Sequence, residues 1–186
     1  TKDDYIDVIA TQDALSRDLL RIGFDGSITE ISQGGLASAT ATTAELQVVV
    51  ESRLDTHTRS YQLRRGVKTE HYFDSLAESP NFTSEVHVLQ TGPHKVNTAV
   101  IFPQGHVYGS KRLPIMMRPY GGPHGPQVQN GALIYAIDQW FADQGFVVVI
   151  ADNRGTGGRG PAWDHAIYQD FVVPVIEDQA NAIADV

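Results

Sequence analysis

The first half of the chain alternates between apolar and polar positions over short runs. Residues 18–32 read DLLRIGFDGSITEIS, in which Asp25 and Gly26 separate two alternating runs. An Asp-Gly pair in this position favours a tight β-hairpin turn. Similar runs at 46–53 and 59–66 continue the pattern. Short strands separated by polar turns are typical of an antiparallel meander, such as a propeller blade or a sandwich.

After the break at SPNF (79–82), three further runs predict strands: SEVHVLQ, KVNTAVIFP and LPIMMRPY. The period then becomes helical, and the following apolar residues share one helical face: Leu133, Ile134, Ile137, Trp140 and Phe141. Asn130 is the expected N-cap of this helix, and Gly145 is its expected left-handed stop. Because the helix joins LPIMMRPY to the apolar run FVVVIA (146–151), we expect a right-handed strand-helix-strand unit whose two strands are parallel and buried.

Composition narrows the classes of function. The chain has 186 residues, 41% of them hydrophobic, and a formal net charge of −8, which opposes binding to nucleic acid or anionic lipid. It contains no apolar run long enough to span a membrane. The absence of cysteine excludes disulfides, thiolate catalysis and cysteine-ligated zinc. It leaves the cellular compartment open, with the cytoplasm as our working expectation.

The stretch DNRGTGGRG (152–160) places three glycines at the Gly-x-Gly-x-x-Gly spacing of a dinucleotide-binding loop. Two features disagree with that function. Three residues separate the strand from Gly155, and Pro161 and Trp163 follow Gly160 where close helix packing requires small residues. We therefore expect no cofactor and interpret the stretch as a structural loop that Arg154 anchors; an oxidoreductase domain is the alternative.

Several segments, in this order, resemble the start of the catalytic domain of the prolyl oligopeptidase family of serine peptidases, and within it the dipeptidyl peptidase IV branch. They are RPYGGPHG (118–125), the helix with Trp140, GFVVVIADNRGTGGRG (145–160), HAIYQD (165–170) and IEDQ (176–179). SRLDTHTRSYQLR (52–64) is similar to the end of that branch's β-propeller.

The resemblance implies an α/β fold class, the N-terminal part of an α/β-hydrolase sheet preceded by antiparallel β-propeller-type strands. Residues 1–79 would form the C-terminal part of the propeller domain. Residues 80–186 would form the N-terminal part of the peptidase domain, truncated before the nucleophile elbow. From both ends of the sequence we expect a fragment of a longer chain.

The family's chemistry requires a serine on a Gly-x-Ser-x-Gly elbow, followed along the chain by an aspartate and a histidine. No Gly-x-Ser-x-Gly occurs here, so we expect the triad to lie beyond Val186 and this fragment alone to be inactive. The parent protein is expected to be a serine exopeptidase that releases dipeptides. Peptidases of the acylaminoacyl or endo type, and a noncatalytic interaction module, are the alternatives. The expected partners are a peptide substrate, the remainder of the parent chain and a second copy in a homodimer.

Tyr120 is the one candidate catalytic residue. It lies in PYGGP, and the resemblance implies that its hydroxyl donates to the oxyanion of the tetrahedral intermediate. A phenol is a neutral donor at working pH and its ring can be held rigidly. The alternative is an aromatic residue that only packs at a strand end.

Other polar residues are expected to be structural. The seven histidines, His124 in the PYGGPHG loop among them, show no metal-ligand spacing. Glu177 and Asp178 are neighbours on a predicted helix and point about 100° apart, so they cannot share a substrate. We expect them to pair with Arg154. Asn81 begins an Asn-x-Thr triplet, which carries no weight without evidence of secretion. Loss of the later strands is expected to leave FVVVIA and the 175–186 helix without cover, which favours self-association.

Overall fold

The computed structural model describes residues 4–41, 46–78 and 83–186. The chain divides into two compact units, one of residues 1–81 with 129–133, the other of residues 82–128 with 134–186. We describe each unit by itself. The expected domain boundary between residues 79 and 80 and the triplet residue Asn81 fall outside the described residues.

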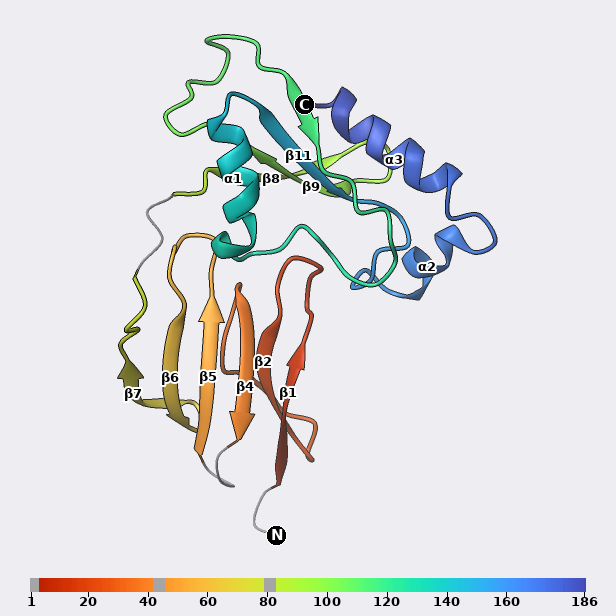
Figure 1. The fold of residues 1–186 in the computed structure, drawn as a ribbon. Coiled ribbons are helices and arrows are strands. Elements are labelled where there is room, and N and C mark those ends of the chain that lie inside the picture. Colours follow the sequence, from red (N-terminus) through yellow and green to blue (C-terminus); the bar gives the residue numbers. More distant parts are fainter. Residues whose placement is uncertain (1–3, 42–45, 79–82) are drawn as a thin grey trace. The chain divides into compact units, whose positions relative to one another are not determined.

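The first unit is built from antiparallel strands in two sheets (Figure 1). The three-stranded sheet has the order β1 (Tyr5–Ala10), β2 (Asp18–Gly23), β3 (Ile28–Glu30). The four-stranded sheet has the order β4 (Leu36–Ala41), β5 (Leu46–Ser52), β6 (Ser60–Arg65), β7 (Lys68–Phe73). In both sheets the strands pair in chain order, as expected for an antiparallel meander.

The predicted hairpin at Asp25-Gly26 is confirmed. Strands β2 and β3 pair across it, and Gly26 has a φ of 87°, which glycine adopts without strain. The carboxylate of Asp25 accepts the Ser27 main-chain N–H at 2.9 Å. The two sheets share a small core of Leu19, Ile31, Ala37 and Val49. The side chains that alternate inward along the strands therefore join the two sheets, as in packed propeller blades.

The second unit contains a mixed four-stranded sheet of order β8 (Val86–Thr91), β9 (Val96–Ile101), β11 (Val147–Asp152), β10 (Ile115–Met117). β10 and β11 run parallel, which confirms the expected strand-helix-strand unit, whereas β9 is antiparallel to both β8 and β11. Every residue of β9 and β11 is buried. The expectation that FVVVIA would lack cover is therefore wrong, because β9, β10 and two helices already surround it.

Strand β10 is shorter and more exposed than predicted. Pro114 and Pro119 lie on either side of it and lack the N–H that strand pairing needs. Ile115 is 42% exposed because β10 is the last strand of the described sheet. The expectation that both parallel strands are buried holds only for β11.

The predicted helix is present, but it begins later than expected. A 3-10 turn, η1 (Ala132–Tyr135), precedes α1 (Ala136–Asp143). Asn130 does not cap α1; its side-chain amide donates to the Ser16 hydroxyl at 3.0 Å within the first unit. Gly145 ends the helix as predicted, with a φ of 102°.

The C-terminal part of the chain forms α2 (Pro161–Asp164), η2 (His165–Ile167) and α3 (Val173–Ala184). Ala182 of α3 packs with Ala151 of β11 and Val96 of β9. Successive side chains of a strand point to opposite faces, so Val148 and Ile150 point to the other face of the sheet. Helix α1 contacts β9 and β11, and Figure 1 shows it crossing in front of the sheet.

Each of the two long helices buries two polar residues and one alanine. Asp138, Gln139 and Ala142 are the buried residues of α1, and Asp178, Gln179 and Ala182 are those of α3. Ile137 and Trp140, on the apolar face that the sequence defines, are 70% and 59% exposed. Among the described helices, none combines the length and apolar character needed to cross a membrane.

Candidate functional site

The loops that follow the two parallel strands meet at one edge of the sheet. Residues 118–128 follow β10 and residues 153–160 follow β11, and parallel strands end at the same edge. A Cβ placed on Gly157 would lie 4.0 Å from the Pro123 carbonyl oxygen, so the two loops are neighbours. This edge holds Tyr120, Arg154 and His124, which the sequence singled out.

Tyr120 lies just past the end of β10 with its ring against the loop backbone. A Cβ on Gly122 would come within 2.9 Å of the Tyr120 ring, so the ring excludes any other residue type there unless the ring moves. Gly121 has a φ of 71°, which lets the chain turn directly after Tyr120. The side chain is 46% exposed, and no described residue hydrogen-bonds its hydroxyl. The Tyr120 ring therefore lies against the loop backbone, and its hydroxyl is available as a donor.

The loop after Tyr120 is tied to the end of β11 by Asp152. The two carboxylate oxygens accept the main-chain N–H groups of Gln127 at 2.7 Å and Val128 at 3.1 Å. Burial raises the pKa of Asp152 to about 6, although both hydrogen bonds and the charges of Arg118 and Arg159 act to lower it. Sequence reasoning missed this contact, because nothing local marks a carboxylate whose partners are 24 and 25 residues earlier.

Arg154 anchors the second loop to α3, as predicted. Its Nε donates to Asp178 at 3.0 Å, and Nη2 donates to Glu177 at 2.8 Å and to the Pro174 carbonyl at 3.1 Å. The Arg154 main-chain N–H also reaches Asp178, at 2.7 Å. Burial lowers the pKa of Arg154, but the hydrogen bonds and charges of the two acids outweigh it and the net pKa is raised.

Backbone conformation and close packing explain the glycines of the DNRGTGGRG loop. Gly155 has a φ of 88°, and a Cβ there would lie 2.3 Å from Cδ1 of Ile167. Gly158 and Gly160 also have positive φ. The helix that opens after this loop, α2, is only four residues long. These features favour the structural interpretation of the loop over dinucleotide binding.

A cavity of about 530 Å³ adjoins the same edge. It is bounded by Pro123 of the Tyr120 loop and by residues from 164 to 171, among them His165, Ile167, Tyr168 and Phe171. Its apolar lining comes from Pro123, Ile167 and the exposed aromatic residues Tyr168 and Phe171.

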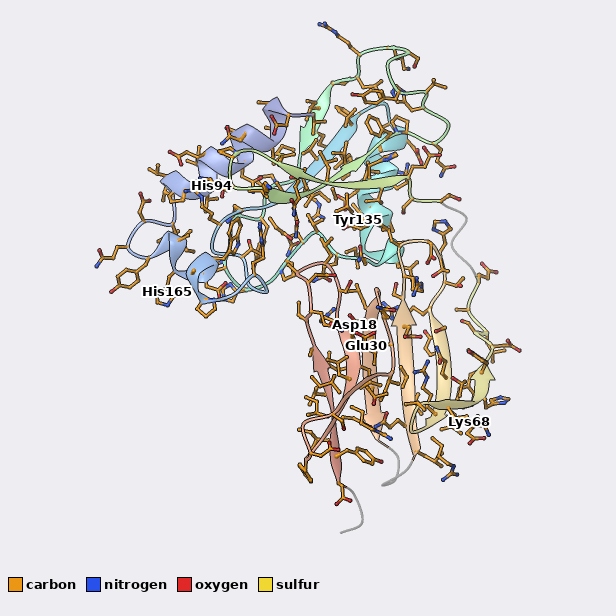
Figure 2. All side chains as sticks on the ribbon, turned by 180° about the vertical axis from the view of Figure 1, so that it is seen from behind. Asp18, Glu30, Lys68, His94, Tyr135 and His165 are labelled. Atoms are coloured by element: carbon orange, nitrogen blue, oxygen red, sulfur yellow. The ribbon has the colours of Figure 1, made fainter. Side chains whose placement is uncertain are left out.

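The histidines do not gather into a metal centre. Figure 2 shows His94 and His165 in different segments, the first in the β8–β9 turn and the second after α2. His165 stacks on Tyr168, and His124 is exposed in the Tyr120 loop. Within the residues that the structure describes, no group of His, Asp and Glu could hold a metal ion.

Comparisons with known proteins agree with this arrangement. Residues 134–186 match the family model described as "Prolyl oligopeptidase family". The chain is 32% identical over 74 residues to prolyl endopeptidase FAP of Mus musculus and 31% identical over 74 residues to the Homo sapiens protein. Each alignment covers 40% of this chain and 10% of the relative.

Solved structures share the fold over nearly the whole chain. Dipeptidyl peptidase 4 of Porphyromonas gingivalis superposes with a TM-score of 0.76 at 20% identity, covering 99% of this chain and 29% of that one. Acylaminoacyl peptidase of Pyrococcus horikoshii superposes with a TM-score of 0.70 at 17% identity, covering 97% of this chain and 28% of that one. The chain thus spans less than a third of the length of these proteins.

The shared fold confirms the predicted fold class, propeller-type antiparallel strands followed by the first part of an α/β-hydrolase sheet. The family match, residues 134–186, includes β11 and α3, which the Arg154 contacts join. Over residues 134–186 the sequence matches the prolyl oligopeptidase family, and nearly the whole chain has the fold of solved peptidases similar to it.

Proposed function

We propose that this chain is part of a serine peptidase that releases dipeptides from the N-termini of peptides, and that Tyr120 donates a hydrogen bond to the oxyanion. The observation that best supports this proposal is the position of the Tyr120 side chain. It is half-exposed at the carboxyl edge of the sheet, its ring is seated on Gly122, and its hydroxyl has no partner among the described residues.

The chemistry follows from where the donor lies. In acyl transfer the serine oxygen attacks the substrate carbonyl, and the carbonyl oxygen becomes negatively charged. A hydroxyl held at that position binds the oxyanion more strongly than the ground-state carbonyl, so it lowers the barrier. The nucleophile, its base and the orienting acid come from the rest of the parent protein, because no Gly-x-Ser-x-Gly occurs among these residues.

Dipeptide release is the finer part of the proposal. It is supported by the sequence resemblance to the dipeptidyl peptidase IV branch and by the similar fold of the Porphyromonas gingivalis dipeptidyl peptidase. The relatives also include an acylaminoacyl peptidase and a prolyl endopeptidase, which are the competing specificities.

Three chromogenic substrates separate these specificities in the full-length protein. They are Ala-Pro-p-nitroanilide with a free amine, its N-acetylated form, and N-acetyl-alanine p-nitroanilide. We expect turnover of the first only, and loss of that turnover after a serine-directed phosphonate. Cleavage confined to the acetylated substrates contradicts dipeptide release, and activity that survives the phosphonate contradicts serine catalysis.

A further inference from the structure

Asp152 is buried at the carboxyl end of β11, and its direct hydrogen bonds go to the Tyr120 loop. It is 4% exposed, and each of its oxygens accepts one main-chain N–H, from Gln127 and from Val128. Hydrogen bonds that a carboxylate accepts from main-chain N–H groups are among the stronger ones in proteins. The Asp152 side chain therefore holds the backbone at Gln127 and Val128 in place.

The neighbouring cations do not compete for this carboxylate. Arg118 pairs with Asp138, with 2.6 Å between Nε and Oδ1. Arg159 donates to the Lys95 carbonyl at 2.9 Å, and its guanidinium lies over the Trp163 ring. Both arginines contribute only a charge at Asp152.

The hydrogen bonds to Asp152 fix the C-terminal end of the loop that carries Tyr120. At the near end, the Arg118 main-chain N–H donates to the Val149 carbonyl at 2.9 Å, which ties the loop to β11 two residues before Tyr120. At the far end Val128 is fully buried and Asp152 holds it. Between these ties, Gly121 and Gly122 allow the backbone to move. The position of Tyr120 then depends on both ties.

We propose that Asp152 is a positioning residue that holds Tyr120 in place through the main-chain N–H groups of Gln127 and Val128. The inference rests on the proposed function, because it assigns Asp152 a role in the reaction through Tyr120. Asp152 itself does not touch substrate. A catalytic donor displaced by about 1 Å loses much of its effect. Loss of the hydrogen bonds to Asp152 should therefore change kcat more than KM.

A double-mutant cycle on the full-length protein tests the inference. Asp152→Asn keeps the side-chain shape, but its NH₂ group faces one of the two donors, so one hydrogen bond is lost. We expect Asp152→Asn to lower kcat about tenfold with KM little changed. In the Tyr120→Phe background we expect the same change to lower kcat by less than about twofold, because the donor is already absent.

Hydrogen exchange supplies a readout that does not depend on activity. Asp152→Asn should accelerate amide exchange in peptides covering 121–128 and leave peptides from β9 unchanged. The matched control is Asp143→Asn. Asp143 also accepts a loop main-chain N–H, that of Gln104 at 2.9 Å, but at the opposite end of β11. This control should alter neither kcat nor exchange in 121–128.

The outcomes separate the two proposals. Full additivity in the cycle, or unchanged exchange in 121–128, overturns the positioning role while leaving the proposed function intact. If Tyr120→Phe keeps the wild-type kcat, the oxyanion role fails and the positioning role fails with it. If Asp152→Asn does not fold, Gln127→Pro removes one of the two donors and leaves the carboxylate in place, and the same kcat pattern is expected.

Discussion

At the scale of single residues, Asp152 makes the stability of its unit depend on pH. Burial raises its pKa from 3.8 to about 6 in the folded protein. The Asp152 carboxyl group therefore binds its proton more tightly in the folded chain than in the unfolded chain. Its contribution to the unfolding free energy is full below pH 3.8 and is lost as the pH rises through about 6. The full span corresponds to about 3 kcal/mol.

We expect this slope to disappear in Asp152→Asn, which cannot titrate. Denaturant unfolding of the wild type and the variant between about pH 3.5 and 6.5 measures it. The wild type should lose stability relative to the variant across that range. A difference in unfolding free energy that is constant with pH would show that Asp152 keeps an ordinary pKa.

Several single-residue features could be anticipated from the sequence, and others could not. The turn at Asp25-Gly26 was predictable because its chemistry is local. Asn130 was a reasonable N-cap, but a partner distant in sequence, Ser16, binds its side chain instead. The Asp152 contacts join loops that only the folded sheet brings together, so no spacing rule could find them.

At the scale of elements, α1 and α3 attach to the sheet in the same way. Each carries the sequence Asp-Gln-x-x-Ala, with Asp138 and Asp178 as the aspartates. Each aspartate pairs with an arginine that follows a strand, Arg118 after β10 and Arg154 after β11. Each glutamine donates to a main-chain carbonyl at or beside a strand end: Gln139 to Phe102 at 3.0 Å, and Gln179 to Ala151 at 2.9 Å.

This repeated attachment explains why helical periodicity located α1 but misjudged its buried face. An apolar face normally packs on the core. Here the inward positions of α1 hold Asp138, Gln139 and Ala142; Asp138 pairs with Arg118, and Gln139 donates to the Phe102 carbonyl. Helical periodicity identifies the apolar face of a helix. It does not show whether the polar residues on the other face have ion-pair or hydrogen-bond partners in the sheet.

The two acids on Arg154 should contribute unequally to stability. Asp178 is 1% exposed and Glu177 is 57% exposed. Removing one partner of a buried pair costs about 3–5 kcal/mol, whereas an exposed pair contributes about 1 kcal/mol or less. We expect Asp178→Asn to lower the unfolding free energy near the low end of that buried range, and Glu177→Gln to change it little.

Equilibrium denaturation of the two full-length variants, which share the same arginine, provides the comparison. Equal losses in both would mean that exposure does not decide the strength of this pair. The sequence predicted that Arg154 pairs with the acidic segment of the helix after the loop, and the structure confirms it. The sequence could not rank the two acids, since their exposure depends on how α3 meets β11.

At the scale of the whole molecule, the family resemblance and the fold class were predicted from segments between 118 and 179 taken in order. The domain assignment, with residues 1–79 as propeller and 80–186 as peptidase domain, stays a prediction. The same holds for the inactivity of this chain alone.

The central claim is that this chain supplies the oxyanion donor, and the kcat of Tyr120→Phe in the full-length protein tests it most directly. Phenylalanine keeps the ring on Gly122 and removes only the hydroxyl. By analogy with the loss of one oxyanion-hole donor, we expect kcat to fall by roughly 10² to 10³ with KM and thermal stability little changed. Near-normal kcat in Tyr120→Phe, together with unfolding of Tyr120→Ala, would show that Tyr120 only packs and would contradict the claim.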